Sequence, residues 1–136
     1  MADKHFLLDI VTPERTVFSG AVQSFTAPGV IGNFQVLFNH APLLSAIGIG
    51  EIKVTDVNGT KVRFATSGGF VEVKANKVIL LAESAESEEE INIERAERSK
   101  NRAMDRLAKK QGDTDVERAR VALSRSLNRL KIASQK

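Results

Sequence analysis

The chain has 136 residues, enough for one ordinary domain or two small ones, and 42% hydrophobic with 27% charged residues is typical of a globular protein. It contains no cysteine, which excludes disulfides, zinc–thiolate sites and thiol catalysis. No apolar run approaches the roughly 18 to 20 residues of a membrane span, and no secretory leader is recognisable, so we expect no direct membrane insertion. The net charge of +3 is concentrated from Ile91 onward, where an acidic partner is therefore expected.

The first part of the chain shows a hydrophobic period close to two, which predicts an all-β domain over residues 1–84. Eight strands are predicted: Phe6–Val11, Ala21–Ala27, Phe34–Phe38, Leu44–Ile47, Gly50–Asp56, Lys61–Thr66, Gly69–Lys74 and Lys77–Ala82. Asn58-Gly59 predicts a type I′ hairpin turn, and Ala75-Asn76 separates the last two strands. Such short strands with regular turns favour a small sandwich or a flattened barrel.

Two apolar segments in this domain invite closer attention. Val78–Ala82 is continuously apolar, which predicts a strand that is central or covered by the C-terminal segment. Gly32–Leu44 gathers large apolar residues near a turn, and these side chains either bind a partner or lie in the core.

An internal repeat occupies the C-terminal part. Its two copies are residues 94–107, ERAERSKNRAMDRL, and residues 117–130, ERARVALSRSLNRL. The repeat predicts two helices that pack antiparallel as a hairpin over residues 85–136. Gly112 is expected to end the first helix. Thr114, three residues before Glu117, is expected to cap the second.

The apolar seam of this hairpin is weak. It contains small or polar residues where a tight coiled coil has leucine, namely at Ala96, Lys100, Ala103, Ala119 and Ser126. Each leucine replaced by alanine forfeits roughly 2 kcal/mol of burial, so the hairpin is expected to open readily. On this interpretation, leucines at Ala96 and Ala119 stabilise the folded form.

Arginines form a stripe on each predicted helix, at positions 95, 102 and 106 and again at 118, 125 and 129. Guanidinium groups bind phosphates in a bidentate manner, so adjacent stripes could converge on a triphosphate. Two other interpretations stay open. The stripes form a solvated face with intrahelical partners, or they bind nucleic acid, although the few aromatic residues lie in the β domain.

The sequence shows no recognisable catalytic motif. His5 and His40 are isolated, and no Ser, His and acid set occurs in a recognisable order. Gly48-Ile49-Gly50 and Ser67-Gly68-Gly69 lack the Lys-Ser/Thr of a phosphate loop. We expect no enzyme, no catalytic residues and no metal site.

Three motifs follow one another along the chain: Asn39-His40-Ala41-Pro42-Leu43-Leu44, Ser67-Gly68-Gly69-Phe70-Val71-Glu72-Val73 and the arginine–alanine hairpin. Together they resemble the epsilon subunit of bacterial F-type ATP synthases. The resemblance implies a two-domain protein, with a β-sandwich of about ten strands followed by an antiparallel α-helical hairpin. It implies a non-catalytic central-stalk subunit at the cytoplasmic face of the bacterial plasma membrane, in a complex that transports protons or sodium ions.

The resemblance also implies partners. The sandwich would couple the gamma subunit to the c-ring, and the hairpin, when extended, would reach the alpha and beta subunits and inhibit ATP hydrolysis. The implied partner interface consists of Asn33, Phe34, Phe38, His40, Pro42 and Leu43. Here the acidic residue that the family often has in this loop is replaced by the run from Gly32 to Leu37. Nucleic acid is not expected as a partner.

Some members of this family bind ATP on the folded hairpin through an Ile-Asp-x-x-Arg-Ala motif. No cofactor is required, but ATP is implied as a regulatory ligand. The matching residues here are Glu86, Ile91, Asn92, Arg95, Ala96, Arg102, Arg125 and Arg129. Asn92 replaces the family's Asp, and its uncharged carbonyl predicts weaker binding. Two alternatives remain, a structural coupler without nucleotide sensing and a freestanding nucleic-acid-binding sandwich.

Overall fold

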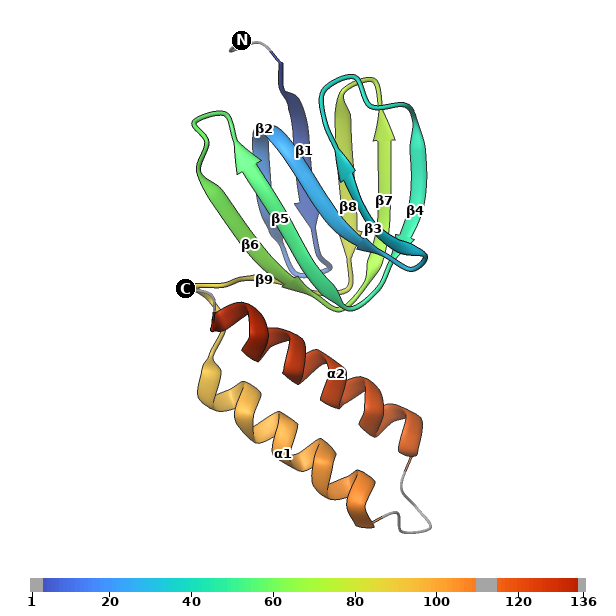
Figure 1. The fold of residues 1–136 in the computed structure, drawn as a ribbon, viewed down its shortest axis with the longest axis vertical. Coiled ribbons are helices and arrows are strands. Elements are labelled where there is room, and N and C mark those ends of the chain that lie inside the picture. The colour runs from blue at the N-terminus through green and yellow to red at the C-terminus, as the bar shows by residue number, and fades with distance from the viewer. Residues whose placement is uncertain (1–3, 110–114, 135–136) are drawn as a thin grey trace.

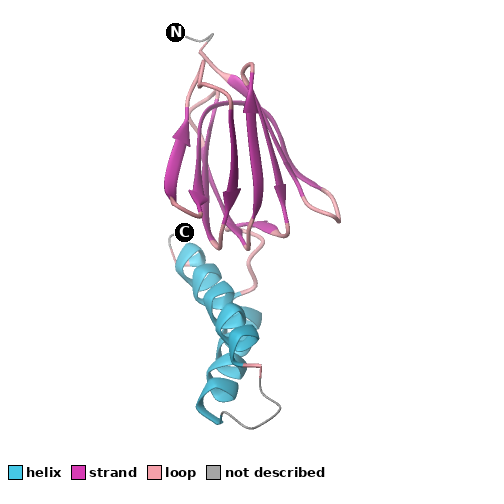
Figure 2. Ribbon diagram, turned by 90° about the vertical axis from the view of Figure 1, so that its right-hand side faces the viewer, coloured by secondary structure: helices cyan, strands magenta, loops and turns pink. Residues whose placement is uncertain are grey.

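A computed structural model describes residues 4–109 and 115–134, which form nine strands and two helices (Figures 1 and 2). The strands are β1 (Phe6–Val11), β2 (Thr16–Gly29), β3 (Gly32–Val36), β4 (Leu43–Ile47), β5 (Gly50–Asp56), β6 (Lys61–Thr66), β7 (Gly69–Lys74), β8 (Lys77–Ala82) and β9 (Ala85–Ser87). The helices are α1 (Ile93–Lys109) and α2 (Val116–Ala133). The predicted two-domain fold, an all-β sandwich followed by a helical hairpin, is confirmed.

The sandwich has two hydrogen-bonded layers. One contains β1, β8, β7 and β4, and the other contains β3, β2, β5, β6 and β9. The long strand β2 joins the layers because it pairs with β1 near its start and with β4 at Gly29. Its pairing with β5 shifts register between Val22 and Ser24, and such a bulge bends a strand from one layer toward the other.

The two ends of the sandwich sequence meet in a parallel pair. β1 runs antiparallel to β2 but parallel to β8, with Leu8 opposite Val78 and Ile10 opposite Leu80. Parallel strands need a long connection, and here the whole intervening sandwich supplies it. Closure of this layer therefore requires the strand that ends at Ala82.

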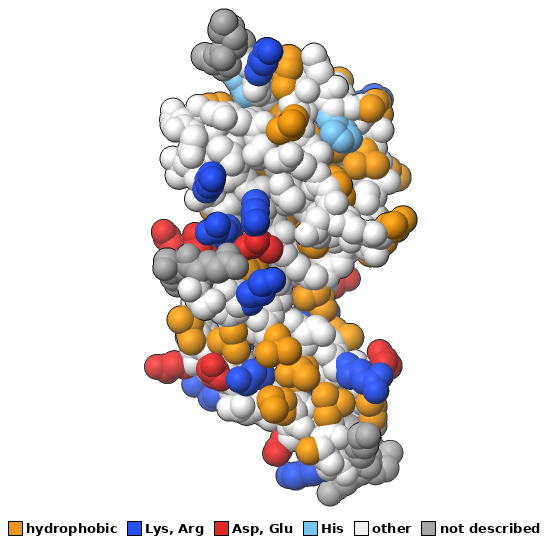
Figure 3. Space-filling view, viewed as in Figure 1, with side chains coloured by type: hydrophobic (Ala, Val, Ile, Leu, Met, Phe, Trp, Pro, Cys, Tyr) orange, Lys and Arg blue, Asp and Glu red, His pale blue; other side chains and the backbone are white. Residues whose placement is uncertain are grey.

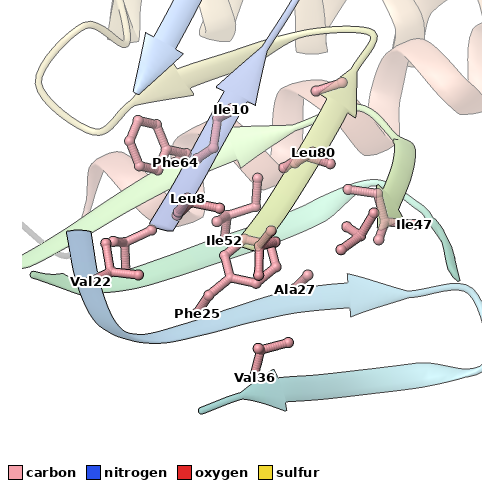
Figure 4. Packing of buried hydrophobic residues seen from close by; sticks show 14 of the residues in the cluster. Leu8, Ile10, Val22, Phe25, Ala27, Val36, Ile47, Ile52, Phe64 and Leu80 are labelled. Carbon is pink, nitrogen blue, oxygen red and sulfur yellow. The ribbon is translucent and has the colours of Figure 1, made fainter. Parts of the chain in front are cut away.

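The core lies between the two layers and follows the period of two in each strand (Figure 4). In β1 the alternate residues Phe6, Leu8 and Ile10 point inward, and in β8 Val78, Leu80 and Ala82 do the same. Phe18 and Phe64 pack edge to face with ring centroids 6.2 Å apart. The core thus draws on every layer-forming strand rather than on one apolar segment.

The predicted strands differ from the observed ones mainly at their ends. β1, β5, β6, β7 and β8 have the predicted bounds, whereas β2 is longer at both ends and β3 is displaced toward Gly32. One strand was not predicted. β9 begins just after the domain boundary predicted at residue 84, and it pairs with β6 through Ala85 opposite Thr66.

The turn types show a further difference. The prediction of a type I′ turn at Asn58-Gly59 is wrong, because that turn needs positive φ at both residues and only Gly59 has it, at 84°. The loop instead spans 57–60, and Asp56 Oδ1 accepts hydrogen bonds from the Asn58 and Thr60 amides. The two-residue left-handed turn is at Ala75-Asn76, with φ of 49° and 58°.

The prediction that Val78–Ala82 forms a strand that is central or covered by the C-terminal segment is confirmed by the first of its two alternatives. β8 is central, because it pairs with β1 on one side and β7 on the other. However, it is not covered on both faces, since Leu81 is 57% exposed and the hairpin contacts β5 and β6 instead.

The helical hairpin follows β9 after the short connection 88–92. Asn92 precedes α1, and its Oδ1 accepts a hydrogen bond from Arg95 N at 3.0 Å. α2 is capped by Asp115, whose Oδ1 accepts from Arg118 N at 3.0 Å, rather than by Thr114. Both Thr114 and Gly112 lie outside the described residues.

The two helices are joined by small side chains. Ala96, Ala103, Ala119 and Ser126 are all buried, and the Ser126 hydroxyl donates to the Ala122 carbonyl at 3.0 Å. Burial of small residues lets helix backbones approach closely, so the weak seam of the sequence is a close-packed contact.

The hairpin rests on one end of the sandwich through α2, and α1 lies on the far side (Figure 1). A small apolar cluster of Ala65, Ile91, Ile132 and Ala133 joins the two parts. Beside it, Asn128 Nδ2 donates to the Gly50 carbonyl at 2.8 Å. In the described part of the chain, neither helix has the length and apolar character needed to cross a bilayer.

Candidate anion site between the sandwich and the hairpin

A cavity of about 590 Å³ lies where the hairpin joins the sandwich. Four segments line it: the β1–β2 turn, the chain from β8 into β9, the start of α1, and the end of α2. The lining residues are Thr12, Glu14, Arg15, Glu83, Ser84, Ala85, Glu86, Glu90, Asn92, Arg95, Ala96 and Arg129. This volume lies in the range of small-molecule pockets in proteins.

Two arginines of the cavity are held by carboxylates at short distance. Arg129 Nε donates to Glu86 Oε1 at 2.6 Å, and Arg15 Nη2 donates to Glu90 Oε2 at 2.6 Å. Both pairs are only partly exposed, and each joins segments far apart in the sequence. The basic and acidic surface at this junction is visible in Figure 3.

The carboxylate of Glu90 is additionally held by its own turn. Ser87 N donates to Glu90 Oε1 at 3.0 Å. This backbone hydrogen bond, followed by the nearby Arg15 guanidinium, lowers the pKa of Glu90 below its ordinary value. The group is therefore ionised at neutral pH.

Five of the eight residues in the nucleotide motif line this cavity, namely Glu86, Asn92, Arg95, Ala96 and Arg129. Asn92 has a structural task here, since its side-chain oxygen caps α1. A second lone pair on that oxygen and the amide group remain for a ligand.

The other three motif residues lie elsewhere. Ile91 is buried in the apolar cluster under the hairpin. Arg125 Nη2 lies 3.7 Å from Glu83 Oε2, and Arg102 Nη2 donates to Ser99 Oγ at 3.2 Å on the surface of α1. The arginine stripes therefore do not converge as two complete rows in this arrangement.

Arg15 and Glu90 are cavity residues that the sequence motifs did not reveal. They are 75 positions apart, and no local pattern connects a turn after β1 with the start of α1. The one available signal is the acidic run from Glu86 to Glu90, which by itself does not point to Arg15.

The residues expected to contact partners are only partly exposed. Asn33 and Pro42 are exposed, whereas Phe34 and Leu43 pack against the core. Phe38 and His40 are half-buried, and His40 Nδ1 lies 2.7 Å from the Ala41 carbonyl oxygen. The segment thus combines core packing with surface exposure.

Larger apolar side chains are exposed at positions that were not predicted. Ile31 is 100% exposed at the tip between β2 and β3, beside exposed Val30. On the outer face of the other layer, Phe70 lies opposite Leu81 across β7 and β8, and both are exposed. Exposed apolar groups that lie next to one another are candidates for contact with a protein partner.

The described residues hold no group of three or more histidines or carboxylates arranged for a metal ion. The chemistry of the cavity is therefore that of guanidinium groups and carboxylates. Guanidinium groups are donors suited to phosphate and carboxylate oxygens, and the cavity draws them from both the sandwich and the hairpin.

Fold and cavity define a class: a β-sandwich platform with a helical hairpin docked at one end over an arginine-containing cavity. Family models agree with both parts. The β-sandwich domain of the ATP synthase delta/epsilon chain matches residues 5–88, and its long α-helix domain matches residues 89–134. The chain belongs to the ATP synthase delta/epsilon chain family.

Curated relatives support this assignment over the full length. The epsilon chain of Pelotomaculum thermopropionicum is 49% identical over 135 residues, covering 99% of this chain and 100% of the relative. That of Desulforamulus reducens is 44% identical over 126 residues, covering 93% and 95%. The predicted resemblance to epsilon subunits is confirmed, and the chain is accordingly a non-catalytic subunit.

The fold also recurs in a solved assembly. A chain in the Euglena gracilis mitochondrial ATP synthase structure, which contains OSCP, F1 and the c-ring, superposes with a TM-score of 0.82 at 19% identity. The match covers 97% of this chain and 82% of that chain. At this identity the likeness concerns the fold.

Proposed function

We propose that this chain is a central-stalk rotor subunit of a proton- or sodium-translocating F-type ATP synthase. In this role the sandwich couples the gamma subunit to the c-ring, and the extended hairpin contacts the alpha and beta subunits and inhibits ATP hydrolysis. As a peripheral subunit it would act at the cytoplasmic face of a bacterial plasma membrane. Full-length similarity to epsilon chains is the observation that carries the proposal.

The way the hairpin is held supports a mobile role. Among the residues that the structure describes, its contacts with the sandwich include an apolar cluster, a hydrogen bond from Asn128 and three partly exposed ion pairs. Exposed pairs each contribute about 0.2 to 1 kcal/mol, so this contact is modest in energy. A hairpin held this way can exchange docked and extended forms.

The surface of the hairpin also suits a second set of partners. Met104 on α1 and Leu127 on α2 are exposed, and apolar side chains group on the hairpin face seen in Figure 3. Together with the basic residues of both helices, this surface fits partners with apolar and acidic groups.

Inhibition is tested by reconstitution with a matching catalytic head. We expect the full chain to slow ATP hydrolysis and a truncation after Glu88 not to do so, while both associate with gamma. This truncation retains β9 and so keeps all nine strands, whereas a truncation after residue 85 would remove most of β9. Equal hydrolysis rates with both proteins would contradict the inhibitory role.

We further propose that the docked form binds ATP in the cavity, which would favour docking by mass action. Arg95 and Arg129 line the cavity and support this placement. In calorimetry, alanine at Arg129 should weaken ATP binding by about tenfold, the scale of one charge-assisted hydrogen bond. If alanine at Arg102 abolishes ATP binding while alanine at Arg129 has no effect, the ligand instead lies outside this cavity. A purely structural coupler would release no heat at millimolar ATP.

The exposed tip between β2 and β3 is proposed as the c-ring contact. Ile31 and Val30 present apolar surface there, just before Asn33 of β3. Association with an apolar ring loop would use this surface without the acidic contact that the family often has.

A further inference from the structure

The arginines that line the cavity are outnumbered by carboxylates, which compete with an anion for them. Three arginines line it, at 15, 95 and 129, together with four glutamates, at 14, 83, 86 and 90. The formal charge of the lining is therefore negative by one. A polyphosphate can bind tightly only when one or more carboxylates give up their arginine.

Arg15 is the arginine best prepared for such an exchange. Its backbone is fixed, because Thr12 N donates to the Arg15 carbonyl at 2.9 Å and Arg15 N donates to Thr12 Oγ1 at 3.3 Å. Its side chain is long, half exposed and held at its end by Glu90. The guanidinium can therefore pivot into the cavity from a rigid base.

The Glu90 carboxylate is correspondingly placed to release the Arg15 guanidinium. It stands in the turn that leads into α1, and its side chain is 43% exposed, so it can rotate toward solvent. Its second oxygen keeps a hydrogen bond from Ser87 N, which holds the turn when Arg15 departs.

Building on the proposed ATP site, we propose that Arg15 is a further phosphate-contacting residue of the cavity and that Glu90 is its internal competitor. Phosphate binding exchanges the Arg15–Glu90 pair for an Arg15–phosphate pair. Because Arg15 belongs to the sandwich while Arg95 and Arg129 belong to the hairpin, one ligand then bridges both parts. The bridge fastens the hairpin in its docked form.

The test compares binding of ATP and of inorganic tripolyphosphate by calorimetry, using the full chain. We expect Arg15→Ala to weaken both ligands by about tenfold, and Arg15→Lys to lose less because it keeps the charge. Glu90→Gln should tighten both by about threefold or more, because it removes a competing charge and retains the oxygen that accepts from Ser87 N. Matched controls are Arg120→Ala and Glu117→Gln, an exposed pair of α2 that lies 3.2 Å apart outside the cavity lining.

The sign of the Glu90 effect separates this inference from a structural role. If the pair merely latches the hairpin, Glu90→Gln weakens binding as Arg15→Ala does, and the inference is overturned. Unchanged binding by Arg15→Ala overturns it too, while leaving the proposed ATP site intact. If neither the wild type nor Glu90→Gln binds either ligand at millimolar concentration, both the inference and the ATP site are rejected. An Arg15 effect on ATP but not on tripolyphosphate would place Arg15 at the nucleoside and contradict phosphate contact.

Discussion

Single backbone positions set tight limits on this sandwich. Gly69 has φ of 152°, and a Cβ built there would lie 2.1 Å from the Leu81 carbonyl oxygen. A backbone carbonyl in a paired strand cannot move aside, so only glycine fits between β7 and β8 at this point. Ala75 shows a milder strain, because it adopts left-handed φ of 49° in the turn before β8.

Gly69→Ala is therefore expected to destabilise the sandwich by about 3 kcal/mol, the scale of a steric and conformational clash in a core strand. The matched control is Gly20→Ala in β2, where an added Cβ meets nothing within 4 Å and φ is not left-handed. Urea unfolding of both variants measures the difference. Similar unfolding midpoints for the two would show that β7 and β8 separate at little cost.

At the scale of elements, the contact between the two helices is packed more closely than the sequence suggested. Alanine at 96 and 119 suggested missing contacts, but both side chains are about 2% exposed. The small residues permit close approach of α1 and α2, so the space for a leucine is already filled. The expectation that leucines there would stabilise the hairpin is accordingly reversed.

We expect Ala96→Leu with Ala119→Leu to weaken the α1–α2 contact by about 1 to 3 kcal/mol, as overpacking does. Faster amide exchange throughout both helices would report it. Ala108→Leu is the control, because that side chain is exposed on α1 and has room. Slower exchange in the double variant would restore the weak-seam interpretation.

The elements also show how far sequence reasoning reaches. Five strands were predicted with correct bounds because turn residues such as Asn58-Gly59 interrupt a clear period of two. The turn type there was wrong, since the Asp56 side chain organises a four-residue loop that local pattern does not specify. The pairing of β9 with β6 was missed because three residues are too few to show a period.

The cavity residues that were predicted come from the family motif before and within α1 and from its matching positions Glu86 and Arg129. Asn92, Arg95 and Ala96 lie close in sequence and were found together. Arg15 comes from a turn 75 residues before its partner Glu90, and only the fold brings them into contact. Arg102, in turn, matched the motif but lies on the outer surface of α1, because the packing of α1 on α2 sets its direction.

At the scale of the whole molecule, charged pairs bridge sandwich and hairpin. They are Arg15–Glu90, Arg125–Glu83 and Arg129–Glu86. All are partly exposed, so salt screens them, whereas the apolar cluster around Ile132 is insensitive to screening. Docking is thus divided between a salt-sensitive and a salt-insensitive contribution.

This division predicts how solution conditions move the hairpin. Raising ionic strength from about 0.05 M to about 0.5 M should weaken the free energy of docking by about 1 kcal/mol for three such pairs. The docked population should fall accordingly. The pKa of Glu90 is lowered from 4.5, so the stability it adds is present above that value and is lost only as pH falls through the lowered pKa. Between about pH 6 and about pH 8, Glu90 should therefore cause no change.

Distance measurements can follow this equilibrium, since the chain has no cysteine and labels can be placed at will. Exposed Lys74 and Ser124 are suitable sites for Lys74→Cys and Ser124→Cys. If the docked fraction does not change with salt concentration, or changes steeply near pH 7, these ion pairs do not contribute to docking as proposed.

The parallel pairing of β1 with β8 has a consequence for how the protein is made. The first strand to leave the ribosome waits for a partner that ends at Ala82, so its layer closes only after most of the domain has been synthesised. The hairpin follows β8 and β9 in the chain, so its helices are synthesised after every strand of the sandwich. The surface on which α2 rests can therefore form before the segment proposed to inhibit ATP hydrolysis is complete.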